Sequence, residues 1–371
     1  MTMLRSSPRP VNTPTGAPLR IAMVAPPWYA VPPDGYGGIE AVVAGLVDGL
    51  VDRGHEVTLI GAGPPGTRAQ YVSVYDEPQS DRVGEALPEV LHAAAAARLV
   101  ADLDVDVVHD HTVAGPLTAG SRRTPTVVTA HGSVGGEPGR FLRELGATVD
   151  LVAISHAQRR LAPDLHWVGC VHNAVDVESF PVGDGSDGYL LFLGRFSPDK
   201  GAHLAIDVAH RLGMSILLAG KIAEPGERRY FDEAVRPHLG PRVCYVGPAD
   251  DQFKRELFRG AEALLFPISW EEPFGLVMVE AMACGTPVVA LHRGSVPEVV
   301  LDGVTGFVVR DPDDLAAAAR KARTLDRAAC RRHAEEHFDL PRMVDGYERI
   351  LRTLVHGSAD AASLTPAAYG G

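Results

Sequence analysis

Apolar residues occur in short runs along the chain, separated by polar turns and amphipathic segments. Segment 37–54, for example, repeats its apolar residues at helical intervals and closes at Gly54, which predicts a helix. Continuous apolar runs between such helices favour a parallel sheet that is covered on both faces. In the first half, the predicted strands are 20–26, 56–62, 106–111, 125–131, 150–155 and 167–173.

The alternating pattern relaxes at 181–188 and then begins again. This segment, PVGDGSDG, is rich in turn residues and is typical of an interdomain linker. The sequence therefore predicts an α/β protein with two doubly wound, Rossmann-like domains, at 20–180 and 189–338. Ligands of such sheets bind beyond the carboxyl ends of the strands, so we expect the site in the cleft between the domains. The predicted strands of the second series are 189–196, 214–220, 242–247, 263–269 and 287–291.

Composition and the two ends of the chain narrow the class of protein. The 371 residues include 47 acidic and 35 basic ones, a formal net charge of -12, so we expect no nucleic-acid partner. Four scattered cysteines suggest reduced thiols and a cytoplasmic location. Residues 1–18 lack the apolar core of a signal peptide, and no apolar run is long enough to span a membrane. We expect 1–19 and 357–371 to be disordered.

Three motifs suggest other functions, and their context argues against each. GAGPPG at 61–66 matches a dinucleotide-binding pattern, but its two prolines lead into a strand-like segment rather than a helix. DLDVD at 102–106 contains two D-x-D triplets, at a turn where a strand begins and thus away from the expected ligand edge. His109 and His111 share one strand face, but no third ligand is suitably spaced, so we expect them to line the cleft. We therefore predict no metal site and no cofactor.

The stretch FLGRFSPDKG at 192–201 ends one predicted strand and opens a helix. Gly194 and Gly201 permit tight backbone turns, and Arg195 and Lys200 add two cations just beyond the strand end. A guanidinium fork and a mobile ammonium are both suited to phosphate oxygens. Two solvated surface charges are the ordinary alternative, but their placement favours a phosphate site.

The stretch SWEEPFGLVMVEAMACGTPVV at 269–289 follows another strand and contains the start of a helix. Glu280 stands in an apolar run, where a carboxylate is costly unless it is paired. It could accept hydrogen bonds from the two hydroxyls of a ribose, while Glu272 would face the sugar at the other end of the ligand. Backbone amides at the helix start would take an anion between them, those of Phe274, Gly275 and Leu276.

These two stretches together resemble the retaining glycosyltransferases of family 4, which have the GT-B fold. The resemblance extends to 37–57, 131–132, 172–180 and 294–309, although this chain has Asn173-Ala174 where the family usually has Asn-Gly. It implies that a final helix, 339–356, crosses back to the first domain. It implies catalytic roles for Glu272, His131, Arg195 and Lys200. The donor-binding residues that it implies are Gly37, Gly38, Gly194, Arg195, Lys200, Glu272, Phe274, Gly275, Leu276, Val277 and Glu280.

The activity implied by this resemblance is transfer of a hexose from a nucleotide diphosphate sugar to an acceptor hydroxyl. The expected mechanism is front-side attack with retention, aided by domain closure about 181–188. UDP-glucose is our first expectation for the donor, because 25–40 resembles glucosyltransferases of the family, and GDP-mannose is the second. The acceptor would be a small molecule, a glycan or a lipid, read by loops 27–40 and 131–140. A lipid acceptor would bring peripheral contact with a membrane.

Two other classes remain open at this point. One is a sugar-nucleotide epimerase with the same fold, which would turn over the donor without any acceptor. The other is a non-catalytic, two-domain sugar-binding protein. That class has no evident use for Arg195 and Lys200 beside a helix N-terminus.

Overall fold

The computed structural model describes residues 16–363, with side chains described up to Gly357. The segments 1–15 and 364–371, part of the two ends expected to be disordered, lie outside the described residues. Order begins before Arg20, because Leu19 is buried and its amide donates to His55 Nδ1 at 3.0 Å. At the other end, the last helix continues to Ser363, beyond the predicted limit at 356, through a segment that contains good helix formers such as alanine.

The first domain is built on a seven-stranded parallel sheet of order β3-β2-β1-β4-β5-β6-β7. Its strands are β1(Arg20–Val24), β2(Glu56–Ala62), β3(Gln70–Tyr75), β4(Val107–Asp110), β5(Thr126–Ala130), β6(Asp150–Ala153) and β7(Trp167–Cys170). Its helices are α1(Gly38–Asp52), α2(Ala86–Asp102), α3(Gly136–Leu145) and α4(His156–Leu161). Because β3 follows β2 without a helix between them, the GAGPPG segment does not open a dinucleotide-binding helix, as predicted.

The second domain is built on a six-stranded parallel sheet of order β10-β9-β8-β11-β12-β13. Its strands are β8(Tyr189–Leu193), β9(Ser215–Ala219), β10(Val243–Gly247), β11(Ala261–Phe266), β12(Val288–Leu291) and β13(Gly306–Val309), the last of which was not predicted. Its helices are α5(Ala202–Leu212), α6(Pro225–Tyr230), α7(Asp251–Gly260), α8(Leu276–Ala283), α9(Val296–Val299), α10(Leu315–Ala322) and α11(Arg327–His337). Short helical turns occur at η1(Ser80–Arg82), η2(Gly115–Ser121), η3(Gly146–Thr148), η4(Val177–Ser179), η5(Pro198–Lys200), η6(Phe231–Val235), η7(Arg236–His238) and η8(Pro312–Asp314).

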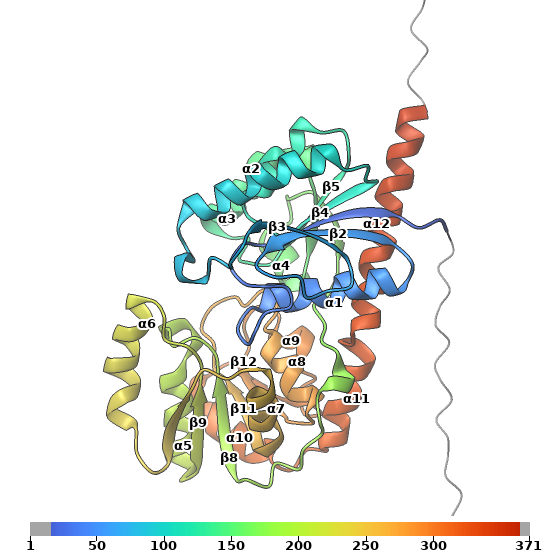
Figure 1. Ribbon diagram of the computed structural model, residues 1–371. Coiled ribbons are helices and arrows are strands. Elements are labelled where there is room, and N and C mark those ends of the chain that lie inside the picture. The colour runs from blue at the N-terminus through green and yellow to red at the C-terminus, as the bar shows by residue number, and fades with distance from the viewer. Residues whose placement is uncertain (1–15, 364–371) are drawn as a thin grey trace, which may run out of the picture.

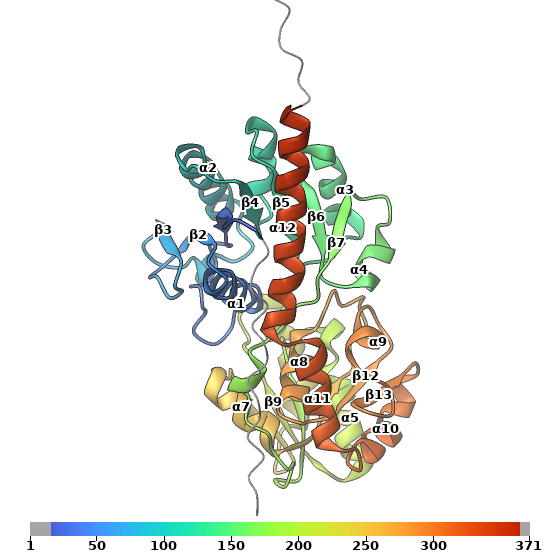
Figure 2. The ribbon, with the colours of Figure 1, turned by 90° about the vertical axis from the view of Figure 1, so that its right-hand side faces the viewer.

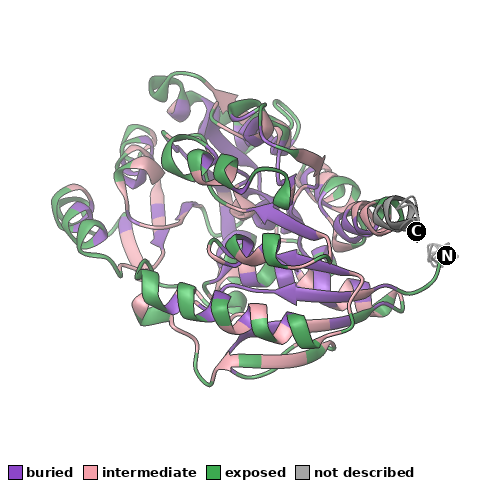
Figure 3. Cartoon of the chain, turned by 90° about the horizontal axis from the view of Figure 1, so that it is seen from above, coloured by how far each residue is buried: buried purple, intermediate pink, exposed green. Residues whose placement is uncertain are grey.

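Helices cover both faces of each sheet, so the sheets form the buried centres of two lobes, one above the other in Figure 1. All four residues of β4 and of β12 are buried, as expected for strands that are covered on both faces. Figure 3 shows the same layering: the central strands are mostly purple, and the covering helices are exposed on their outer sides. The α/β class and the two doubly wound domains predicted from the pattern are thus confirmed.

The final helix, α12(Leu340–Ser363), crosses back from the second domain to the first (Figures 1 and 2). Its residues Val344, Tyr347 and Leu351 are buried in the core of the first domain. Two glycines of α1 let the helices approach closely, since a Cβ at Gly45 would lie 2.6 Å from Leu340 Cδ2 and one at Gly49 would collide with Val344. This crossing was predicted from the family resemblance.

The chain passes between the domains at two neighbouring places. The first crossing is near Val175, and the second is near residues 338–340. The two are hydrogen-bonded to each other: Val175 O accepts from the Leu340 amide at 3.2 Å, and the Val175 amide donates to Phe338 O at 3.0 Å. The segment 181–188 lies against the second domain, where the amides of Gly183 and Gly185 donate to Cys284 and Arg259 at 3.0 and 3.1 Å. The two crossings therefore lie side by side, just before this segment.

Candidate active site

The carboxyl ends of both sheets face the junction of the two domains. In the second sheet, β8 lies between β9 and β11, so the sheet reverses direction of growth there. Gly194 and Arg195 directly follow β8, and the loop 267–275 follows β11. Predicted site residues from separate parts of the sequence thus start from neighbouring strand ends. In the first domain, Gly37 and Gly38 lie at the start of α1, in the connection that follows β1.

Glu272 is paired with Lys200, and both side chains are largely buried. The ammonium Nζ donates to Glu272 Oε2 at 2.5 Å, and the side chains are 11% and 15% exposed. Nζ also lies 4.8 Å from the ring centroid of Trp270, a distance at which a cation is attracted to the ring face. An ammonium has three N–H donors, so the bond to Glu272 leaves others for a ligand.

Glu280 is paired with a lysine that the sequence analysis did not single out. Lys254 of α7 donates to Glu280 Oε1 at 2.6 Å, with side chains that are 16% and 10% exposed. Burial lowers the pKa of Lys254. The charges of Glu280 and Asp251 and their hydrogen bonds together raise this pKa by more than burial lowers it, so the net shift is upward. The lysine therefore stays charged at neutral pH, and the cost of a carboxylate in this apolar run is offset by a strong ion pair.

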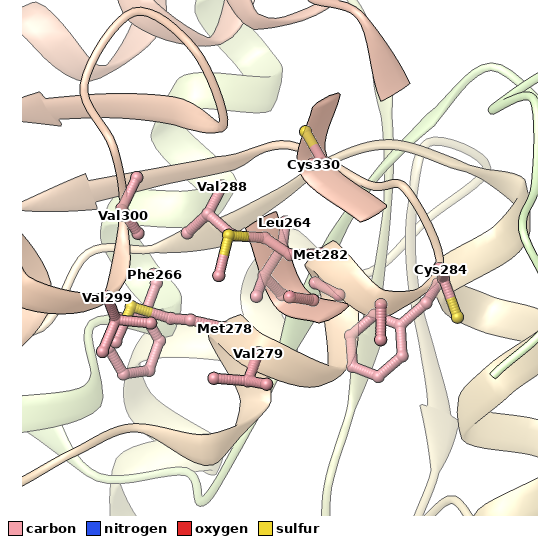
Figure 4. Close-up of a cluster of buried hydrophobic side chains, with 14 of the residues drawn as sticks. Leu264, Phe266, Met278, Val279, Met282, Cys284, Val288, Val299, Val300 and Cys330 are labelled. Carbon is pink, nitrogen blue, oxygen red and sulfur yellow. The ribbon is translucent and has the colours of Figure 1, made fainter. Parts of the chain in front are cut away.

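Gly275 is the N-cap of helix α8, and its φ of 77° is a left-handed conformation that favours glycine. No side chain caps this helix start, so its first amides point outward without a protein acceptor of that kind. On the other side of the helix, Met278, Val279 and Met282 pack among apolar side chains of β11, β12 and the segment 299–300 (Figure 4). The apolar packing fixes the helix, and its N-terminus is presented at the domain junction.

The loop that carries Glu272 rests on residues 294–295 of the next βα connection. Gly294 has a φ of 48°, and a Cβ there would collide with the backbone of Glu272. The amide of Ser295 donates to Glu272 O at 3.0 Å, and its hydroxyl donates to Phe274 O at 2.7 Å. These contacts position the loop, and the sequence analysis had used 294–309 only as part of the resemblance.

Gly38 has open space around it on the junction side of α1. A Cβ at Gly38 would meet no protein atom within 4 Å, whereas a Cβ at Gly37 would lie 2.7 Å from Pro33 Cβ. The fold itself thus gives a steric reason for glycine at Gly37 but none at Gly38. Nearby, burial raises the pKa of Glu40 from 4.5 to about 7, and the side chain lies in the first turn of α1.

The connection before Gly37 touches the second domain directly. Lys221 Nζ donates to Tyr29 Oη at 2.5 Å and lies 4.0 Å from the ring centroid of Tyr36. Arg195 stands nearby, with its Nη1 3.7 Å from Glu227 Oε1, which is beyond hydrogen-bond distance. The guanidinium therefore keeps donors for another partner, on the side where the two domains meet.

His131 follows β5 and lies beside His111, which follows β4. His131 Nε2 and His111 Nδ1 are 2.8 Å apart, and His111 Nε2 lies 3.0 Å from Met23 Sδ. Because a thioether only accepts, His111 carries its proton on Nε2 and accepts from His131 at Nδ1. Burial lowers the pKa of His131 to about 4, so it is neutral and keeps a free acceptor at Nδ1. His109 and His111 do share one face, with ring centroids 4.1 Å apart, and both are buried.

The D-x-D triplets lie at the opposite edge of the first sheet, between α2 and β4. Asp106 accepts from Arg20 Nη2 at 2.6 Å, and Asp104 is also paired with Arg20. The bond to Arg20 lowers the pKa of the Asp106 carboxyl. These aspartates therefore hold the start of β1 against the start of β4, in agreement with the sequence interpretation. Among the described residues, no helix is both long and apolar enough to cross a membrane.

The family of the chain follows from its matches to known proteins. Residues 179–337 match the model of the glycosyl transferases group 1, and residues 36–179 match that of glycosyltransferase family 4. A phosphatidyl-myo-inositol mannosyltransferase of Mycolicibacterium smegmatis is 30% identical over 339 residues, covering 81% of this chain and 83% of that protein. The chain therefore belongs to the group 1 glycosyl transferases of family 4, and it is a glycosyltransferase.

Other similar proteins agree with this family and with the GT-B fold. A D-inositol 3-phosphate glycosyltransferase of Mycobacterium bovis is 32% identical over 270 residues, covering 60% of this chain and 55% of that protein. The crystal structure of a glycosyltransferase involved in avilamycin A biosynthesis is 29% identical, with a TM-score of 0.70 over 92% of this chain and 99% of that one. A sucrose-phosphate synthase from Thermosynechococcus elongatus, 21% identical, shares the fold with a TM-score of 0.77 over 91% of this chain and all of that one.

Proposed function

We propose that this glycosyltransferase moves a hexose from a nucleotide diphosphate sugar to an acceptor hydroxyl, with retention of the anomeric configuration. The observation that carries the proposal is the pair of lysine-held carboxylates on either side of the α8 N-terminus. Glu272 precedes this N-terminus and Glu280 follows it, and each keeps an oxygen beyond the one bonded to its lysine. A ligand with hydroxyls at both ends and an anion between them suits this arrangement.

We propose that separate groups bind the ribose, the diphosphate and the transferred sugar of the donor. Glu280 accepts hydrogen bonds from the ribose hydroxyls. The amides from Phe274 to Val277, together with Arg195 and Lys200, hold the diphosphate, which Gly37 and Gly38 approach from the first domain. Glu272 accepts from the transferred sugar. His131 contributes its Nδ1 as an acceptor for a hydroxyl at the reacting end, which a neutral imidazole can do.

The proposed reaction is front-side substitution. The bond between the anomeric carbon and the diphosphate oxygen breaks, the acceptor oxygen bonds to that carbon on the same face, and the acceptor proton passes to the leaving phosphate. Charge that develops on the diphosphate is stabilised by Lys200, by Arg195 and by the positive end of α8. Because these groups already supply positive charge there, we propose that transfer does not require a divalent metal. Ion pairing to Lys200 also disfavours Glu272 as a covalent nucleophile, since it ties up the charge.

Two observations bear on the identity of the donor sugar. The resemblance of 25–40 to glucosyltransferases supports UDP-glucose. A relative that is 30% identical over 81% of this chain transfers mannose, by its name, and supports GDP-mannose instead. Both donors are therefore included in the binding test below. The cytoplasmic location expected from the sequence stays a prediction.

We further propose that the acceptor carries a negative charge. A cavity of about 330 Å³ lies beside Glu271, between α4 of the first domain and the loops after β12 and β13. Three arginines line it, Arg160, Arg293 and Arg310, and Glu271 is the carboxylate among the lining residues. Arg160 also pairs with Glu298 at 3.4 Å, which leaves Arg293 and Arg310 as the cations in excess. Guanidinium groups favour phosphate and carboxylate. Relatives named for phosphatidyl-myo-inositol and for D-inositol 3-phosphate, two phosphorylated compounds, support the same class of acceptor.

Isothermal titration with UDP, GDP, UDP-glucose and GDP-mannose tests the donor site. We expect Glu280→Ala to weaken binding of the bare nucleotide diphosphate, because the ribose is present in it. Glu272→Ala should mainly weaken binding of the sugar nucleotide. Equal loss of the nucleotide diphosphate in both variants would contradict the assigned division.

Product analysis tests the reaction itself. Incubation with donor and inositol phosphate, in the presence of EDTA, should give a product whose anomeric proton signal matches that of the donor. An inverted product, or activity that EDTA abolishes and Mg²⁺ restores, would overturn the mechanism. Donor turnover without acceptor would instead support an epimerase. Binding without any turnover across a broad acceptor panel would support a sugar-binding protein.

A further inference from the structure

Three side chains with metal-binding atoms meet behind the proposed active site. His156 is the first residue of α4, Cys170 is the last residue of β7, and His172 follows two residues later. One ligand atom from each, a ring nitrogen or the thiol sulfur, lies within 4.8 Å of the others. All three side chains come from the first domain, so the group does not depend on domain closure for its ligands.

The group lines an accessible cavity rather than a packed core. The cavity has a volume of about 340 Å³ and extends from His156, Cys170 and His172 to Met343 and Arg349 of α12. His156 is exposed, and the other two are half-buried. An ion therefore has a path to the group from solvent, and there is room for a water molecule beside it.

We propose that His156, Cys170 and His172 bind one divalent cation of the zinc class. Imidazole nitrogen and thiolate sulfur are the preferred ligands of zinc, at roughly 2.0–2.1 and 2.3 Å, which puts tetrahedral ligand atoms about 3.3–3.6 Å apart. The spacing of at most 4.8 Å requires each side chain to move by only about an ångström. Water would take the fourth position, as in zinc sites with three protein ligands.

Glu298 orients His172 for this role from the other domain. Its Oε2 lies 3.1 Å from His172 Nε2, and its two carboxylate oxygens accept from the amides of His156 and Ala157 at 2.8 and 2.5 Å. A carboxylate only accepts, so His172 carries its proton on Nε2 and leaves the lone pair of Nδ1 for a metal. Metal-binding histidines usually have such a carboxylate on the second ring nitrogen.

The bound ion would act on the junction between the domains. Glu298 belongs to α9 of the second domain, and His172 also lies against Phe274, with ring centroids 5.7 Å apart. Phe274 stands next to the start of α8. Fixing His172 therefore stiffens the wall behind the proposed diphosphate site. This proposal concerns a separate site and does not rest on the proposed sugar transfer.

Cobalt is a suitable probe, because a cobalt–thiolate bond gives an intense charge-transfer absorption band. We expect the full-length chain, stripped with a chelator, to bind one equivalent of Co²⁺ with this band, and Zn²⁺ to displace it. Cys170→Ser should lose the band. His156→Gln should weaken binding at least tenfold, and as an exposed residue it can be changed without disturbing the core.

Matched controls separate this site from adventitious binding. Cys244→Ser removes another half-buried thiol, and His166→Gln removes another exposed histidine, so both should bind Co²⁺ as the wild type does. Glu298→Gln should keep the band but lower the affinity about 10- to 100-fold. The proposal is overturned if the wild type shows no stoichiometric binding, if the band survives in Cys170→Ser, or if either control loses it.

Discussion

Replacing Gly38 by alanine should separate donor binding from folding. A Cβ at this position would meet no protein atom within 4 Å, and Gly38 is the first residue of α1. Because alanine reduces the freedom of the unfolded chain without a clash, we expect the free energy of unfolding to rise by about 0.5–1 kcal/mol. The same methyl group would project into the space that we assign to the diphosphate.

The loss of affinity can be estimated from one hydrogen bond. A methyl group that holds the phosphate about 1 Å further away stretches an N–H···O bond from about 2.9 Å beyond its useful range. A hydrogen bond to a charged group contributes about 1.5–3 kcal/mol, which corresponds to a dissociation constant about 10- to 150-fold higher. Stability and affinity should therefore move in opposite directions.

Urea unfolding measures the first effect, and calorimetric titration with UDP and GDP measures the second. Gly357→Ala is a matched control, since Gly357 is also an exposed helical glycine with no atom within 4 Å of an added Cβ. It should gain stability and keep the wild-type affinity. Unchanged affinity in Gly38→Ala would refute the approach of the diphosphate to Gly38. A loss of stability would refute the open space that we infer around it.

Three further changes test the electrostatics and packing. Lys254→Met should cost about 3 kcal/mol of unfolding free energy by leaving Glu280 buried and unpaired; adding Glu280→Gln should recover much of it, and a purely additive double-mutant cycle would argue against the pair. The raised pKa of Glu40 means that its protonated form stabilises the fold fully below pH 4.5, and that this stability, about 3 kcal/mol, is lost as the pH rises through about 7. Glu40→Gln should flatten that dependence in urea unfolding measured from pH 4 to 8, and an unchanged slope would assign it to another group. Gly49→Ala should lower the free energy of unfolding by about 1–3 kcal/mol, because its methyl group collides with Val344 of α12. An unchanged melting temperature would show instead that α12 shifts to accommodate the methyl group without strain.

Local patterns were enough to predict the fold and the position of the donor loops. The eleven strands predicted from apolar runs, and the strand-like segment after GAGPPG, each overlap a strand of the structure. Residues placed just after a predicted strand, such as Arg195 and Glu272, therefore had to lie at the carboxyl edge of a parallel sheet. The alternation of strands and helices also implied which edge of each sheet faces the cleft. β13 was missed because Gly306–Val309 is short and follows a turn.

The partners of the two carboxylates could not be predicted in the same way. Glu280 and Lys254 are 26 residues apart on different helices, and their contact depends on how α7 packs beside α8. The close contact between Gly294 and the Glu272 backbone depends on how two separate loops approach each other. Neither leaves a periodic signal in the sequence, because tertiary packing decides both contacts. The apolar surroundings of Glu280 indicated only that some partner was needed.

The return of α12 to the first domain has a consequence for how the protein is made. Tyr347 and Leu351 complete a core whose strands end by Cys170, so an emerging first domain lacks part of its interior. At a synthesis rate of about 5–20 residues per second, the ribosome needs roughly ten to forty seconds to supply the missing helix. During that interval the apolar face of α1 around Gly45 and Gly49 is open to solvent and to chaperones. The first domain begins the chain, yet it is among the last parts of the protein to be finished.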